Sequence, residues 1–160
     1  QILGKKILSS SIKKSVDNLY RMKYFDSLVI CHQYTRLPYP EKKLLEIAEK
    51  IYCTEKIFSG KKTNLILCSD YYIRKLNRQY RNIDKVTDVL SFEMGDSDLL
   101  GEIYISLERA KVQSRRFGIT YDDEIIRLFV HGFFHLLGYD HQGIKERELM
   151  ESKERNYIKL

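Results

Sequence analysis

Several features of secreted and membrane proteins are missing from this sequence. Only three of its 160 residues are cysteine, and they are widely spaced without a C-x-x-C pair. Neither a disulfide framework nor a thiolate zinc site is therefore indicated, and a reducing compartment fits best. No apolar run approaches the length of a membrane span, and the first residues lack the unbroken apolar segment of a secretion signal. These absences predict a cytoplasmic protein without a membrane partner.

Charge is present but unevenly distributed. The formal net charge is +6, and residues 1–26 hold six basic and two acidic side chains, which leaves only +2 for residues 27–160. The longer part therefore gives weak evidence for a nucleic-acid partner, which only a local basic patch could strengthen. Apolar residues in the first segment recur at helical spacing opposite a basic face. We predict that residues 1–26 are an amphipathic appendage on a domain at residues 27–160, with a ribosome-contacting or membrane-surface arm as the less favoured alternative.

The elements predicted for residues 27–160 alternate between strands and helices. The chain is 43% apolar, enough to bury a core without disulfides. Strands are expected at Leu28–His32, Asn64–Cys68, Asp88–Phe92 and Gly101–Ser106. Helices are expected after Pro40, after an N-cap at Asp70 with Ile73, Leu76 and Tyr80 inward, from Ser106 to Gly118, after the capping signature Thr120-x-x-Asp123 and over about Ile144–Ile158. The last two strands are close enough to form an antiparallel pair. The pattern predicts a single α+β domain with one mixed four-stranded sheet, about five to six helices and a metal cleft.

Three of the four histidines gather in one short stretch of the chain. His131 and His135 are four residues apart, so on a helix they share one face and can point at the same ion. Gly138 can take the left-handed conformation that ends a helix, which would bring His141 back toward the other two. Three ring nitrogens with an open fourth position are typical of a catalytic zinc site.

The spacing of this stretch is that of the long zinc-protease motif, with one departure. Position 132 is glycine, whereas those proteases carry a glutamate there as the general base. A metal-dependent hydrolase of peptides or small molecules is therefore the less favoured alternative. A third interpretation is a non-catalytic ribosome-associated factor in which zinc only holds the last helices together, which a fourth protein ligand would indicate.

Three stretches of the chain are informative together. They are Leu76-Asn77-x-x-Tyr80-Arg81-x-x-Asp84-Lys85-x-Thr87-Asp88-Val89-Leu90-Ser91-Phe92, then Gly101-Glu102-Ile103-x-Ile105-Ser106, then the block from His131 to His141. In combination they resemble the YbeY family of bacterial endoribonucleases. The resemblance covers most of the chain but not residues 1–26. It implies a mixed α+β fold, maturation of the small-subunit ribosomal RNA and ribosome quality control, with ribosomal RNA and the small ribosomal subunit as partners.

The resemblance also implies roles for particular residues. It implies one zinc ion held by His131, His135 and His141, and a catalytic function for Arg81; His131 is the second predicted catalytic residue. A guanidinium can bind a phosphate with two hydrogen bonds and stabilise the charge that grows during attack. Lys85 is predicted to add a positive charge that binds the substrate. Single-stranded RNA is expected to be the substrate, because a flexible strand enters a narrow cleft more readily than a duplex.

The residues that move protons stay open at this point. Asp140 and Glu124 are candidates for a general base, and each could equally orient a histidine. Asp88 and Ser91 suit hydrogen bonds at the ends of a hairpin as well as a direct role. The attacking oxygen could come from water or from the 2′-hydroxyl of the RNA.

Overall fold

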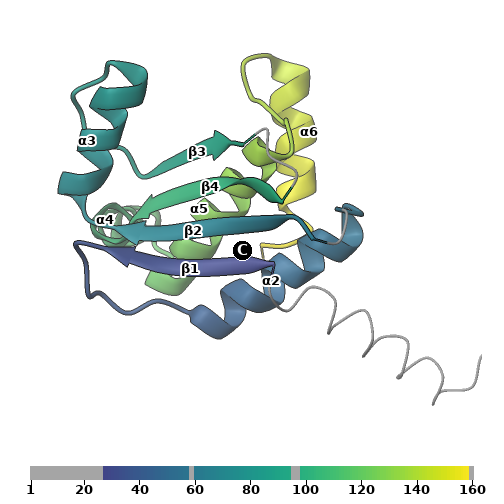
Figure 1. Cartoon of the computed structure of the whole chain (residues 1–160), viewed down its shortest axis with the longest axis horizontal. Coiled ribbons are helices and arrows are strands. Elements are labelled where there is room, and N and C mark those ends of the chain that lie inside the picture. Colours follow the sequence, from purple (N-terminus) through teal and green to yellow (C-terminus); the bar gives the residue numbers. More distant parts are fainter. Residues whose placement is uncertain (1–26, 58–59, 95–97, 159–160) are drawn as a thin grey trace, which may run out of the picture.

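The computed structural model describes residues 27–57, 60–94 and 98–158 (Figure 1). The predicted appendage at residues 1–26 lies outside the described part of the chain. The elements in chain order are β1 (Leu28–Gln33), α2 (Glu41–Thr54), β2 (Lys62–Cys68), α3 (Asp70–Arg81), β3 (Val89–Glu93), β4 (Leu99–Ser106), α4 (Leu107–Phe117), α5 (Tyr121–Leu136) and α6 (Ile144–Glu154). None of the helices in these ranges is both long enough and apolar enough to cross a membrane.

The four strands form one mixed sheet in the order β1-β2-β4-β3. β1 pairs with β2, and β2 with β4, in parallel, whereas β3 runs antiparallel to β4 with Ser91 opposite Ile103. The predicted mixed α+β architecture and the predicted antiparallel pair are both confirmed. Because β3 is an edge strand, one of its sides is not covered by another described strand, and this side borders the functional site.

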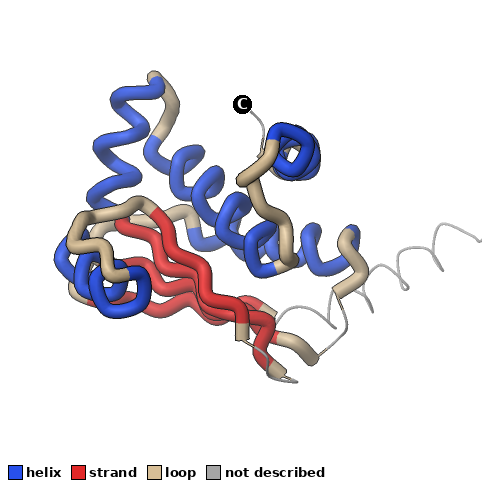
Figure 2. The backbone as a smooth tube through the Cα atoms, turned by 90° about the horizontal axis from the view of Figure 1, so that it is seen from above, coloured by secondary structure: helices blue, strands red, loops and turns tan. Residues whose placement is uncertain are grey.

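The two faces of the sheet are buried by different helices. Leu65 and Leu67 of β2 belong to the large core that the sheet shares with α2 and α5, whereas Ile66 and Cys68 belong to a smaller cluster under α3. This division follows from the alternation of side chains along a strand. Figure 2 shows the resulting layers, with α5 running along one side of the sheet. β2 is therefore a central strand that is buried on both faces.

Helix α5 is fixed at its start by a cap and along its length by close packing. The Thr120 hydroxyl accepts a hydrogen bond from the backbone N–H of Asp123 at 3.1 Å, as the capping signature predicts. Gly132 lies directly against the sheet, where an added Cβ would be 2.8 Å from Cγ2 of Ile103 and 2.9 Å from Oγ of Ser91. The Ser91 hydroxyl also donates to the Gly132 carbonyl at 2.9 Å. The missing side chain at position 132 is thus what lets α5 approach β3 and β4.

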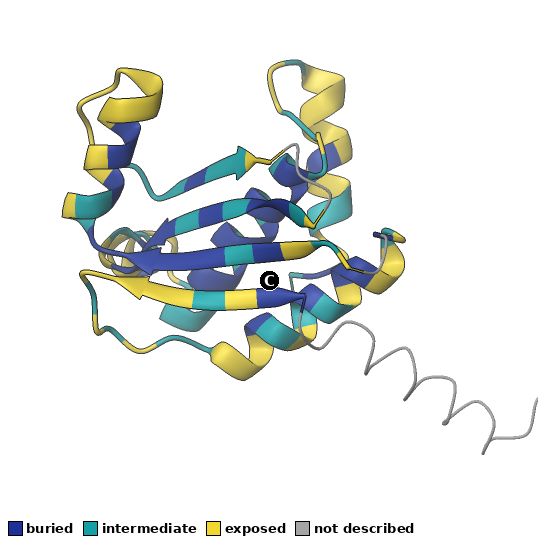
Figure 3. Cartoon of the chain, in the orientation of Figure 1, coloured by how far each residue is buried: buried dark blue, intermediate teal, exposed yellow. Residues whose placement is uncertain are grey.

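Two predictions about α3 are wrong. The N-cap is Ser69, whose hydroxyl accepts from the N–H of Tyr72, and Asp70 instead forms an ion pair with Arg109 at 2.7 Å. Tyr80 was predicted to face inward, but 59% of it is exposed. The reason is visible in Figure 3, where the last turn of α3 extends away from the sheet and has no layer beneath it.

The last helix is shorter than predicted. It ends at Glu154 instead of Ile158, because Arg155 to Tyr157 form turns that close onto its final carbonyls. The Tyr157 ring is buried against Phe134 at 5.7 Å between ring centroids. This contact anchors α6 beside the end of α5.

Candidate metal centre

The three clustered histidines come from the last turns of α5 and the segment that follows it. Gly138 has a φ of +84°, the left-handed conformation expected from the sequence. Its N–H donates to the His135 carbonyl at 3.0 Å, and the N–H of Tyr139 donates to the Phe134 carbonyl at 3.1 Å. These two bonds form a Schellman turn, whose usual apolar contact is the Phe134–Tyr139 ring pair at 5.3 Å. The turn reverses the chain and returns His141 to the helix.

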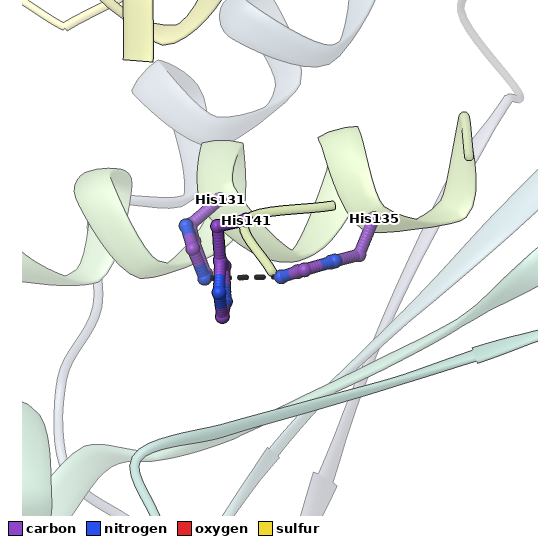
Figure 4. A group of neighbouring side chains, drawn as sticks. All are labelled: His131, His135 and His141. Atoms are coloured by element: carbon purple, nitrogen blue, oxygen red, sulfur yellow. Dashed lines mark hydrogen bonds between the residues drawn. The ribbon is translucent and has the colours of Figure 1, made fainter. Parts of the chain in front are cut away.

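The ring nitrogens of His131, His135 and His141 lie within 4.8 Å of one another (Figure 4). Nε2 of His131 and Nε2 of His135 are 3.2 Å apart. Two ligands of a tetrahedral zinc ion at about 2.0–2.1 Å from the metal are roughly 3.3–3.4 Å apart, so this spacing fits a shared ion. The donor set therefore fits a metal: the three histidines could hold one ion and leave a coordination position open.

The surroundings of His135 favour the neutral form of its imidazole. Burial lowers the pKa of His135, and the neighbouring rings of His131 and His141 lower it further. A neutral imidazole is the form that binds a metal, because a protonated ring has no free lone pair. The backbone N–H of His141 donates to Oδ1 of Asp140 at 2.7 Å, which holds the segment that carries the third ring.

A carboxylate on α6 orients the first histidine. Nδ1 of His131 is 2.9 Å from Oε1 of Glu154, whose side chain is 14% exposed. A proton on Nδ1 that is donated to this carboxylate leaves the Nε2 lone pair directed toward the other two rings. No spacing in the sequence signals Glu154, because it is one of several acidic residues on a highly charged helix. Its role becomes visible only when α6 is placed beside α5.

The histidines open into a cavity of about 670 Å³. Arg81, from the end of α3, and Phe92, from β3, line the same cavity as the three rings. Among the described residues Arg81 has no carboxylate partner within ion-pair distance. The predicted site residue Lys85 is not among the residues that line the cavity; it is exposed, and its carbonyl accepts from the Asn77 side chain at 2.8 Å.

The remaining polar candidates divide into two groups. Asp88 and Ser91 line the cavity, but they also hold the layers together: Asp88 accepts from the Val89 N–H at 2.9 Å and from Gln113 at 3.0 Å, and Ser91 donates to the Gly132 carbonyl. Glu124 is fully buried away from the cavity lining. Both of its oxygens accept from the guanidinium of one residue, Arg127, at 2.7 and 2.8 Å.

A three-histidine cluster that could hold one metal ion shares a cavity with Arg81, which has no ion pair within the described residues. The fold and this cavity place the protein in the class of α+β proteins with a mixed sheet and a candidate metal site. A model of the family described as Endoribonuclease YbeY matches residues 30–160. The chain belongs to the YbeY family.

Individual relatives extend this comparison. The Endoribonuclease YbeY of Pelotomaculum thermopropionicum is 39% identical over 124 residues, which cover 72% of this chain and 82% of that protein. The Endoribonuclease YbeY of Nautilia profundicola is 47% identical over 105 residues, covering 64% of this chain and 74% of that protein. The solution structure of TM1509 from Thermotoga maritima is similar with a TM-score of 0.57 at 32% identity, covering 81% of this chain and 86% of that one. The predicted fold class and family are confirmed.

Proposed function

We propose that this protein is a zinc-dependent endoribonuclease that cuts single-stranded RNA in the cytoplasm, during maturation and quality control of the small ribosomal subunit. One observation carries the proposal: three imidazoles that can hold an ion share an open cavity with the guanidinium of Arg81, which has no ion-pair partner in the described part of the chain. The relatives from Pelotomaculum thermopropionicum and Nautilia profundicola are both named endoribonucleases, which supports the same activity. Ribosomal RNA and the small subunit are the partners that this function requires.

In this proposal His131, His135 and His141 hold the zinc ion through their ring nitrogens, and Glu154 keeps the His131 ring in the binding orientation. A set of three imidazole nitrogens suits zinc among the available divalent ions. When bound, the ion would supply Lewis-acid chemistry that polarises a phosphate oxygen. His131 contributes to catalysis as a ligand of the ion. Glu154, which lies outside the histidine cluster, fixes the orientation of its ring and the position of its ring proton at Nδ1.

Arg81 binds the scissile phosphate. Its guanidinium presents a planar pair of N–H donors that matches two phosphate oxygens. Asp88, Glu93 and Asp140 also line the cavity, but no carboxylate of the described residues lies within ion-pair distance of Arg81. Hydrogen bonds to these oxygens become stronger as negative charge accumulates on the phosphorus centre during attack. Lys85, which is exposed beyond the end of α3, adds positive charge along the path of the substrate.

Asp140 is the proposed proton acceptor. Of the two carboxylates that the sequence offers as a base, it is the one that borders the cavity, whereas Glu124 is committed to Arg127. One oxygen of Asp140 accepts from the His141 N–H. The other oxygen can take the proton of the attacking hydroxyl as the new P–O bond forms, and return it to the leaving oxygen as the old P–O bond breaks.

Cleavage assays with and without a chelator test the function. Zinc-loaded protein is incubated with single-stranded RNA, with duplex RNA and with an unstructured peptide. We expect chelator-sensitive cleavage of the single strand, slower cleavage of the duplex and an intact peptide, because Gly132 supplies no base for amide hydrolysis. Chelator-sensitive cleavage of the peptide without RNA turnover would contradict the proposal and favour the peptide hydrolase.

A further inference from the structure

Helix α3 carries a stripe of arginines that ends in the histidine cavity. Arg74, Arg78 and Arg81 are exposed, and at roughly 100° per residue they lie within an arc of about 60° on one face of the helix. The stripe is about 10 Å long, given a rise of about 1.5 Å per residue. Its last member, Arg81, lines the cavity with the three histidines. A chain of negative charges that follows this face would therefore be led into the site.

A second hollow lies along the same helix. It has a volume of about 360 Å³ and is lined by Tyr71, Arg74, Lys75, Arg78 and Asp84. Arg74 donates two hydrogen bonds to Asp84, at 2.9 and 3.0 Å, so the one carboxylate of the hollow is already neutralised. Lys75 and Arg78 have no carboxylate partner among the described residues. The hollow therefore has excess positive charge and suits a phosphate.

An exposed aromatic ring lies next to Arg81 in the last turn of α3. Tyr80 is 59% exposed although it is an aromatic residue of a folded domain. One side of its ring packs on Phe92, with centroids 5.1 Å apart, and Phe92 in turn packs on Tyr104 at 5.7 Å. The Tyr80 ring therefore packs on a residue that lines the cavity, while much of its own surface remains open to solvent.

A simpler explanation is that the arginines form a solvated helix face and that Tyr80 only covers the small apolar cluster under α3. Two observations argue against it. A solvated face normally mixes charges of both signs. Arg74 is paired with Asp84, but Lys75, Arg78 and Arg81 have no carboxylate within ion-pair distance among the described residues. A ring that served as a cover would also be buried by its contact with Phe92, as the neighbouring Leu76 is at 8% exposure.

We propose that α3 guides single-stranded RNA into the histidine cavity, with Lys75 and Arg78 binding the backbone next to the phosphate held by Arg81 and with Tyr80 stacking on an adjacent base. This rests on the proposed ribonuclease function and adds the path of its substrate. Stacking on an aromatic ring is tolerant of sequence but requires an unpaired base, since a base inside a duplex has no free face. The path therefore selects single strands without selecting a sequence.

Binding measurements on three variants test the path. Fluorescence anisotropy of a labelled, unstructured oligoribonucleotide is recorded at several salt concentrations with protein kept in chelator, so that the probe is not cleaved, and a denaturing gel checks that the probe stays intact. We expect Lys75→Gln/Arg78→Gln to weaken binding roughly tenfold and to flatten the dependence of log K on log salt by about 1.4, since each lost contact to a single strand contributes about 0.7. We expect Tyr80→Ala to weaken binding about tenfold and Tyr80→Phe to change it less than about twofold.

The matched control is Lys111→Gln/Arg115→Gln on α4, which removes one lysine and one arginine from another exposed helix. It should leave affinity and salt dependence unchanged, and thermal melting should show that all variants are folded. If the α3 variants bind like the wild type while the wild type cleaves RNA, the path is wrong and the ribonuclease function stands. If the wild type neither binds nor cleaves RNA, the proposed function fails and the path fails with it.

Discussion

Nδ1 of His131 lies 2.9 Å from Oε1 of Glu154, across 23 residues of sequence. The contact joins the end of α5 to the end of α6 and sets which nitrogen of the ring faces the other histidines. The position of α6 is therefore part of the metal site, although no predicted ligand belongs to that helix.

Replacing Glu154 by glutamine should weaken metal binding about 10- to 100-fold, because the amide removes the charge that favours a proton on Nδ1 of His131. Competition with a fluorescent zinc chelator measures the affinity. Glu151→Gln, at an exposed position one turn earlier on α6, is the matched control and should bind like the wild type. Equal affinities for the two variants would show that Glu154 does not support the site.

Replacing Arg81 by lysine should lower the rate of RNA cleavage about tenfold or more while metal content and melting temperature stay unchanged. Lysine keeps the positive charge but loses the planar pair of donors that binds two phosphate oxygens. Single-turnover cleavage assays measure the effect, with Arg115→Lys on the exposed face of α4 as the control. Unchanged cleavage by the Arg81 variant would remove this residue from the mechanism.

Replacing Gly132 by alanine should destabilise the protein by about 1–3 kcal/mol, although the same change in an open helix interior would stabilise it by about 1 kcal/mol. The added Cβ would lie 2.8 Å from Ile103 and 2.9 Å from Ser91, in the contact that brings α5 onto the sheet. Chemical denaturation measures the free energy of unfolding. A variant that is more stable than the wild type would show that the sheet can move to make room.

Under native conditions two of the three thiols should react rapidly with a disulfide reagent at pH 8, and the third only after unfolding. Cys31 and Cys53 are exposed, whereas Cys68 is buried and donates to the Ile105 carbonyl at 3.4 Å. Burial raises the pKa of the Cys68 thiol to about 12, so the reactive thiolate does not form until well above the assay pH. A Cys68→Ala variant should lose only the thiol that reacts after unfolding. Three rapidly reacting thiols in the native wild type would contradict this placement.

The parts of the site that the sequence predicts are those that depend on neighbouring residues. His131 and His135 share a face because of helical geometry alone, and Gly138 adopts the positive φ that its lack of a side chain allows. The capping by Thr120 is equally local. Each of these features involves at most a few residues of chain, so their spacing carries the information.

The parts that the sequence does not predict depend on how distant elements pack. The contact of Glu154 with His131 requires α6 to lie beside α5, and many acidic residues could have filled the position. The exposure of Tyr80 follows from the length of α3 relative to the sheet, which its apolar spacing does not reveal. The N-cap of α3 is Ser69, one residue before the predicted Asp70, because Asp70 pairs with Arg109 on α4.

The two links at His131 close loops of very different length. The turn at Gly138 lets His131 and His141 meet across ten residues of chain, whereas the contact with Glu154 spans 23 and encloses all of α6. Loop-closure entropy makes the longer link about 0.7 kcal/mol more costly to form. In the described part of the chain α6 packs mainly on α5 rather than on the sheet, so it should open before the rest of the domain whenever His131 loses its orientation. Amide hydrogen exchange in α6 should therefore be slow when the three histidines are in place and faster when they are not.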